Sequence, residues 1–113
     1  MTAYAIAHLR TPTAHEDVFT YIERIQETMD PYGGVFLVHG AEVEVLEGAW
    51  PGTVVILSFP DVEAARGWYA SPAYQEILPL RTRHIDGDTL IVEGVPSGYS
   101  ARVTAGRLRA AAA

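Results

Sequence analysis

Four histidines are the side chains of this sequence that titrate near neutral pH when unperturbed: His8, His15, His39 and His84. His39 ends an apolar run and stands beside Gly40, where a strand bulge could re-aim its side chain. We therefore predict that His39 is the best candidate for acid–base chemistry. No pair of histidines has the i, i+4 spacing of a helical metal site, so the sequence predicts no metal site.

Aromatic residues around a predicted helix break form the most distinctive cluster of the sequence. Tyr74 offers a hydroxyl that needs a partner if buried, and we predict that it acts with His39 in catalysis. Arg81 could hold an anionic group as a fork-shaped donor, or pair with a nearby acid. The full predicted ligand-binding set is His8, Trp50, Trp68, Tyr69, Ser71 and Arg81. The alternatives remain core packing for Trp68, a helix cap for Ser71 and a solvated edge strand for Glu42 and Glu44.

The residue types that are missing exclude several kinds of chemistry. The chain has 113 residues and contains no Cys, so thiol nucleophiles, disulfides and Cys-bound metal centres are excluded. All eight basic residues are Arg, so Schiff-base chemistry and a phosphate-loop lysine are excluded. We find neither a dinucleotide fingerprint nor a nucleophile elbow, and we predict an enzyme without a cofactor.

The charges are divided between a body and a tail. Residues 1–95 contain all fourteen acidic residues, whereas residues 96–113 contain three arginines and no acid. An acidic body argues against nucleic acid as a partner, and we expect the Ala/Arg-rich tail to be a solvated extension. The sequence shows neither a membrane span nor a signal peptide, so we expect a cytoplasmic protein.

Periodicity places the residues above on a series of strands and helices. Residues 3–9 alternate as a strand, and an apolar stripe over residues 18–32 indicates a helix that Thr13 caps with Glu16. Residues 35–47 are interpreted as one strand bent by a bulge at Gly40, with a tight hairpin at Gly40-Ala41 as the alternative. That strand should carry Phe36 and Val38 on one face and His39 on the other.

The second half of the chain repeats this plan with a broken helix. Residues 53–59 form the most β-rich run and should be a central strand. Asp61 is expected to cap the next helix, and Ser71-Pro72 to restart it until Pro79 kinks or ends it. Residues 89–95 complete the set as the last strand.

The order β-α-β-β-α-β predicts an α+β fold of the ferredoxin-like split βαβ type, with an antiparallel sheet and helices on one face. The strands at residues 35–39 and 53–59 are apolar on both faces, so the bare face of the sheet should not meet water. We predict a homodimer that stacks two sheets, with Val55 as a member of the stacked face. A pocket between sheet and helices should be lined by His39, Trp68, Tyr69, Tyr74 and Arg81.

Several segments of the chain are distinctive as a set, among them Tyr32-Gly33-Gly34-Val35-Phe36-Leu37-Val38, Trp68-Tyr69-Ala70-Ser71-Pro72-Ala73-Tyr74-Gln75 and Val92-Glu93-Gly94-Val95. Together they resemble a small bacterial family, that of domain of unknown function 1330. The resemblance covers residues 3–95 and implies the dimeric α/β-barrel superfamily. Relatives there include cofactor-free quinone-forming monooxygenases, haem-degrading monooxygenases and muconolactone isomerases. Many of the oxygenases rely on an Asn, and this chain has none.

We therefore predict an enzyme that acts on a small aromatic or polyketide-like compound by monooxygenation, isomerisation, cyclisation or decarboxylation. The alternatives are a non-catalytic protein that binds or carries a small ligand, and a purely structural dimer. The predicted organisation is one domain over residues 1–95, followed by the tail.

Overall fold

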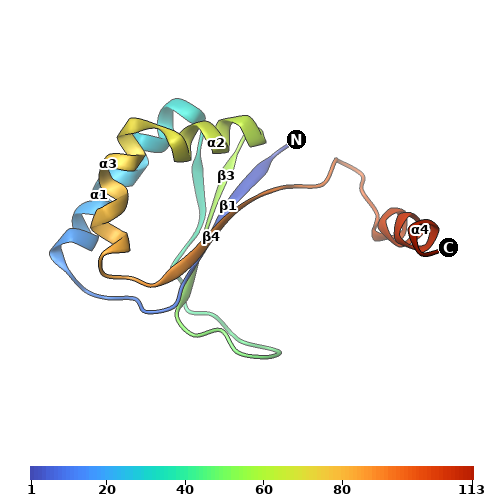
Figure 1. Cartoon of the computed structure of the whole chain (residues 1–113), viewed down its shortest axis with the longest axis horizontal. Coiled ribbons are helices and arrows are strands. Elements are labelled where there is room, and N and C mark those ends of the chain that lie inside the picture. The colour runs from blue at the N-terminus through green and yellow to red at the C-terminus, as the bar shows by residue number, and fades with distance from the viewer.

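The computed structural model describes all 113 residues, and its body is a four-stranded sheet with three helices on one side (Figure 1). The body contains β1 (Ala3–Leu9), α1 (Glu16–Met29), a short 3-10 turn (Asp30–Tyr32), β2 (Val35–His39), β3 (Thr53–Phe59), α2 (Val62–Ala70), α3 (Pro72–Thr82) and β4 (Gly87–Glu93). The strands run in the order β2-β3-β1-β4, and every neighbouring pair is antiparallel. The predicted α+β ferredoxin-like fold is confirmed.

The alternation of β1 divides the sheet into two chemically different faces. Its short side chains, Ala3, Ala5 and Ala7, face the helices, and Ala3 and Ala5 are buried there. Tyr4, Ile6 and His8 alternate with them and face the other side. No helix of the body covers that outer face (Figure 1).

The outer face is apolar along all four strands. Register places Ile56 of β3 opposite Ile6 of β1 and Val38 of β2, and Ile6 opposite Leu90 of β4. Leu90 is 53% exposed and Val35 is 50% exposed, so large apolar side chains meet solvent in the single chain. Val55, predicted on this face, instead faces the helices beside Leu57, because the alternation of β3 puts Val54 and Ile56 outside.

Strand β2 differs from the prediction in two ways. The register shifts between Phe36 and Val38, so the bulge lies at Leu37 and not at Gly40. The extra residue returns His39 to the same face as Phe36, and the two rings stack 4.4 Å apart. The prediction that His39 and Phe36 lie on opposite faces of the strand is therefore wrong.

The strand also ends earlier than expected. It stops at His39, and residues 40–52 form a long loop that projects away from the sheet (Figure 1). At this end of β2 the Gly40 N–H donates a hydrogen bond to the Val54 carbonyl of β3. Because β3 begins at Thr53, the residues after Gly40 have no part of β3 to pair with. Neither the long bent strand nor the tight hairpin at Gly40-Ala41 is present.

The N-cap residues of α2 and α3 are the predicted ones, whereas the N-cap of α1 differs from the prediction. Asp61 accepts the Ala64 N–H at 2.8 Å, and Ser71 accepts the Tyr74 N–H at 3.2 Å, as predicted. At α1 the cap is His15, whose Nδ1 accepts the Asp17 N–H at 3.0 Å. Thr13 instead donates to the Thr11 carbonyl, so the expected capping box does not form.

The helices α1 and α3 end in different ways, and the tail forms a further helix. Gly33 adopts a left-handed conformation with φ 69° and terminates the turn after α1. Pro79 does not end α3, which continues to Thr82, and the Pro79 carbonyl accepts the Arg83 N–H. The tail forms α4 (Ala101–Ala112), which stands apart from the sheet (Figure 1). None of the helices combines the length and apolar character that a membrane span requires.

Candidate functional site

A cavity of about 510 Å³ lies between the sheet and the helices. Its sheet wall is made of small or medium side chains of β1 and β3, among them Ala5, Ala7 and Val55. Its helix wall includes α1, where Phe19 and Ile22 line the cavity and are 45% and 44% exposed. These two residues mark the mouth of the cavity, and most of the lining is apolar. A cavity of this size and character is a usual setting for a small organic ligand.

The polar groups of the cavity come from α1 and α3. The Tyr21 hydroxyl lies 2.8 Å from the Tyr74 hydroxyl, and both residues line the cavity. Tyr74 is held in place because Ser71 caps its backbone and because its ring packs 4.2 Å from the ring of Trp68. The Trp68 indole N–H donates to Thr28 at 2.9 Å, which fixes the aromatic wall in turn.

Arg81 is a buried cation without an acidic partner. It is 7% exposed and lines the cavity, and none of the ion pairs in the chain includes it. Its guanidinium carbon lies 5.5 Å from the centre of the Tyr21 ring, a cation–π contact. Burial alone would lower the pKa of Arg81, but the tyrosine oxygens more than offset this and the net shift is upward. The cavity therefore presents a permanent positive charge to whatever enters it.

The Tyr21 hydroxyl is a hydrogen-bond donor at neutral pH. Burial is the largest of the causes that raise its pKa well above the ordinary value of 10.0, and the adjacent Tyr74 adds to the shift. The Arg81 cation acts in the opposite direction but does not cancel it. Tyr21 and Tyr74 can thus offer an O–H to an oxygen of a ligand, next to a guanidinium.

The structure brings four of the predicted residues together around this cavity: His39, Trp68, Tyr74 and Arg81. His39 is exposed at the end of β2, its ring stacks on Phe36 and its side chain makes no hydrogen bond, so it lies at the rim. Ser71 is buried, accepts the Tyr74 N–H and donates to the Trp68 carbonyl at 2.7 Å, so it serves as a cap. Tyr69 lies outside the cavity and lines a smaller hollow that shares Arg81.

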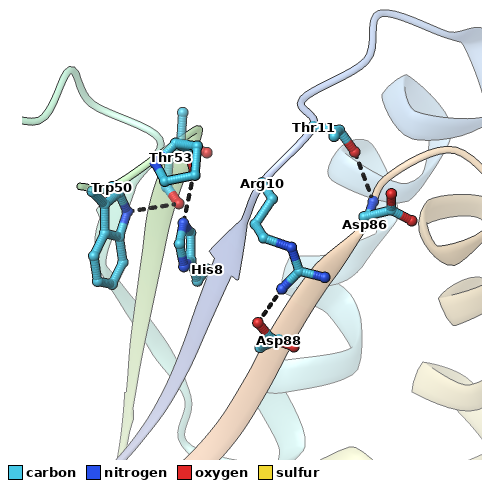
Figure 2. A network of polar contacts seen from close by, with 8 residues as sticks. His8, Arg10, Thr11, Trp50, Thr53, Asp86 and Asp88 are labelled. Carbon is cyan, nitrogen blue, oxygen red and sulfur yellow. Dashed lines mark hydrogen bonds and ion pairs between the residues drawn. The ribbon is translucent and has the colours of Figure 1, made fainter.

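His8 and Trp50 lie on the other face of the sheet (Figure 2). Their rings stack 4.0 Å apart, His8 Nε2 donates to the Pro51 carbonyl at 2.7 Å, and the Trp50 indole donates to Thr53. Arg10 pairs with Asp88 of β4 nearby (Figure 2). Because His8 alternates with the alanines that face the helices, neither ring reaches the cavity.

Sequence reasoning missed Tyr21. The predicted stripe of α1 ran through Val18, Ile22 and Ile25, whereas the buried residues are Val18, Tyr21, Ile25, Thr28 and Met29. Tyr21 stands four residues before Ile25 and three after Val18, so the same periodicity fits it equally well. Tyr21 is buried because its hydroxyl finds a partner in Tyr74, whereas Ile22 is 44% exposed.

Comparisons with known proteins place this fold in a wider setting. A family model described as domain of unknown function (DUF1330) matches residues 2–95. The RPA0582 protein of unknown function from Rhodopseudomonas palustris is 18% identical, with a TM-score of 0.65 over 84% of this chain and 83% of that chain. SnoaB, a cofactor-independent oxygenase from Streptomyces nogalater, is 13% identical, with a TM-score of 0.53 over 88% and 96%.

A third similar structure is a dimeric ferredoxin-like protein of unknown function from Thermobifida fusca. It is 16% identical, with a TM-score of 0.57 over 83% of this chain and 92% of that chain. No curated protein matches the sequence. At these identities the structural likeness shows the fold alone.

The raised pKa of Tyr21 predicts a loss of stability in alkaline solution. An unfolded tyrosine ionises near pH 10, whereas folded Tyr21 does not, so stability should be full below pH 10 and fall as the pH rises further. The loss from one such group is about 1.4 kcal/mol per pH unit. Urea unfolding between pH 8 and 11 should show a steeper fall for the wild type than for Tyr21→Phe. Tyr99→Phe, in the tail segment before α4, is the control, and equal slopes for all three proteins would contradict the prediction.

Proposed function

The chain belongs to the DUF1330 family, whose name assigns no chemistry, and from its cavity we propose that it is an enzyme acting on a small aromatic or polyketide-like compound with an acidic oxygen. The observation that carries the proposal is Arg81, a buried cation with no acidic partner that opens onto an apolar cavity. A buried charge is costly unless a partner compensates it. A phenolate, enolate or carboxylate oxygen of a ligand would be that partner.

The proposed mechanism uses the cavity to stabilise an oxyanion. His39 takes a proton from the substrate, and the negative charge that develops on the substrate oxygen is held by Arg81 and the Tyr74–Tyr21 hydroxyl pair. Such preorganised donors act strongly in a site that excludes water. Monooxygenation by O₂, isomerisation and cyclisation can each begin with this proton transfer, and decarboxylation can pass through the same oxyanion. No step requires a nucleotide or a metal ion.

A protein of similar fold provides a precedent for this proposal. SnoaB is a cofactor-independent oxygenase, so a fold of this kind can house oxygenation without a cofactor. Its likeness to this chain concerns the backbone, and the residues proposed here for the chemistry come from this cavity.

A second part of the proposal concerns assembly. We propose that the chain forms a homodimer through the outer face of the sheet, which carries Ile6, Val38, Ile56 and Leu90. An uncovered apolar face of this extent is typical of an interface. The Thermobifida fusca relative is a dimeric ferredoxin-like protein.

Binding of two matched dyes should reveal the charge of Arg81. Anilinonaphthalene sulfonate carries an anion that its neutral analogue phenylnaphthylamine lacks. A hydrogen bond to a charged group contributes about 1.5–3 kcal/mol, so Arg81→Gln should weaken the anionic dye about 10- to 100-fold and leave the neutral dye nearly unchanged. Fluorescence titration gives both dissociation constants. Arg24→Gln, an exposed arginine paired with Glu76, is the charge-matched control.

Two further variants locate the dyes and test the role of charge. Ala7→Phe should fill the cavity and weaken both dyes, because Ala7 lines it. Arg81→Lys should keep part of the preference for the anion. Equal loss of both dyes in Arg81→Gln, with the fold intact by circular dichroism, would show that Arg81 does not bind an anion.

Turnover should depend on His39. Hydroxylated naphthoic acids and anthrones provide a substrate panel, followed by an oxygen electrode and by mass spectrometry of the products. Removal of a general base costs about 100-fold or more in turnover, so His39→Ala should lose at least this much on any compound that the wild type converts. His8→Ala is the matched control, because its ring lies on the other face of the sheet. Normal turnover by His39→Ala would remove His39 from the mechanism.

Turnover of the panel compounds by the wild type distinguishes an enzyme from a ligand-binding protein. If the wild type binds panel compounds and converts none of them, the chain is a ligand-binding protein and the enzyme proposal is wrong.

The dimer is tested by placing a charge on the outer sheet face. Ile56→Arg would bury an unpaired charge in the interface, a penalty of several kcal/mol that should yield monomers. Sedimentation velocity at micromolar concentration should show a dimer for the wild type and for Glu23→Arg, which places the same side chain at an exposed position of α1. A wild type that sediments as a monomer would contradict the proposal.

A further inference from the structure

Two histidines and one aspartate meet at the start of α1, away from the Tyr21–Tyr74–Arg81 group. His84 Nε2 lies 2.9 Å from Asp17 Oδ2, and His15 Nδ1 lies 3.8 Å from the same oxygen. One ligand atom from each of the three residues lies within 4.8 Å of the others. The two imidazole rings stack with their centres 3.8 Å apart.

The backbone brings these three residues together before anything binds. His15 is the N-cap of α1 and Asp17 belongs to its first turn. His84 comes 67 positions later in the chain, directly after α3, and its N–H is bonded to the Arg81 carbonyl at 3.1 Å. A helical metal spacing in the sequence does not reveal this group, because its third side chain comes from another element.

We propose that His15, Asp17 and His84 form a binding site for a zinc ion. Two imidazole nitrogens and one carboxylate oxygen are ligands that zinc accepts, with a water molecule completing a tetrahedron. Hard cations such as Mg²⁺ and Ca²⁺ prefer sites made wholly of oxygen, so two imidazoles select against them. A tetrahedral zinc ion with bonds of about 2.0–2.1 Å needs its ligand atoms roughly 3.4 Å apart. The three ligand atoms already lie within 4.8 Å of one another, and the two imidazole rings would turn out of their stacked arrangement to direct both lone pairs at the ion.

The hydrogen bonds already present indicate which ligand atoms the ion would use. His15 Nδ1 accepts the Asp17 N–H, so in the neutral ring this nitrogen carries the lone pair and Nε2 carries the proton. Zinc at Nδ1 would replace that single cap bond. Between His84 and Asp17 the ion would take the place of the proton that the 2.9 Å contact shares.

The proposed zinc site is separate from the proposed reaction. None of its three residues lines the cavity, but the adjoining residues Ala14, Val18 and Ile85 do. A bound ion would therefore tie the start of α1 to the segment after α3 beside the cavity wall, without contacting a ligand inside. The proposed function uses no metal, and the zinc site does not depend on it.

The composition of the chain makes the assignment easy to test. There is no Cys, and only two further histidines exist. His8 is bonded to the Pro51 carbonyl and His39 stacks on Phe36, and neither belongs to another group of three metal-ligating side chains.

The experiment titrates tag-free full-length protein with zinc chloride in an isothermal calorimeter. We expect one zinc ion per chain. Loss of an outer-shell partner alone weakens metal affinity about 10- to 100-fold, so losing a direct ligand in His84→Ala should cost at least about 100-fold. Asp17→Asn keeps the side-chain shape and should lose affinity similarly, whereas His8→Ala should bind as the wild type does. Circular dichroism establishes that each variant is folded.

Two spectroscopic and thermal measurements complete the test. Cobalt added in place of zinc should give the visible absorption of a tetrahedral site in the wild type and not in His84→Ala. Zinc should raise the melting temperature of the wild type and of His8→Ala, and leave that of Asp17→Asn unchanged. Absence of saturable binding at micromolar zinc, or equal affinity in the wild type, His84→Ala and Asp17→Asn, would overturn the proposal.

Discussion

The hydroxyl groups of Tyr21 and Tyr74 lie 2.8 Å apart where α1 packs on α3 above the sheet. A buried hydroxyl is costly unless it finds a partner, and in this layer each tyrosine supplies the partner of the other. The pair therefore fixes how α1 and α3 sit relative to each other. It also determines where Arg81 lies, because the guanidinium rests on the Tyr21 ring. This contact thus joins the two helices that supply the hydroxyl groups and the positive charge of the cavity.

Local sequence patterns predicted much of the fold. Strands β1 and β3 begin and end where alternation and β-rich composition placed them, at residues 3–9 and 53–59. Asp61 and Ser71 cap their helices because short polar side chains suit that position whatever lies around them. These features depend on neighbours within a few residues, and such neighbours can be seen in a sequence.

Features that depend on distant neighbours were harder to predict. The bulge at Leu37 depends on how β2 meets β3, and it moved His39 to the helix face, where the cavity lies. Residues 42–47 alternate like a strand, yet no strand lies beside them. Tyr21 and Ile22 fit the same helical stripe, and only the hydroxyl of Tyr74 decides between them. His8 and Trp50 belong to the predicted ligand-binding set as plausible residue types, although the alternation of β1 already puts His8 on the face of the sheet that the alanines do not share.

The alanines of β1 have a consequence for how this fold can diversify. Ala5 and Ala7 sit on a strand bonded on both sides, so the backbone beneath the cavity has little freedom to shift. A larger side chain there would take up room in the cavity and leave β2 and α3 where they are. Strand β1 thus sets the size of the compound that the cavity admits, whereas α1 and α3 supply the polar side chains that contact it. Proteins that descend from one ancestral chain could change their preferred ligand by single substitutions in the middle of the sheet and keep the rest of the cavity unchanged.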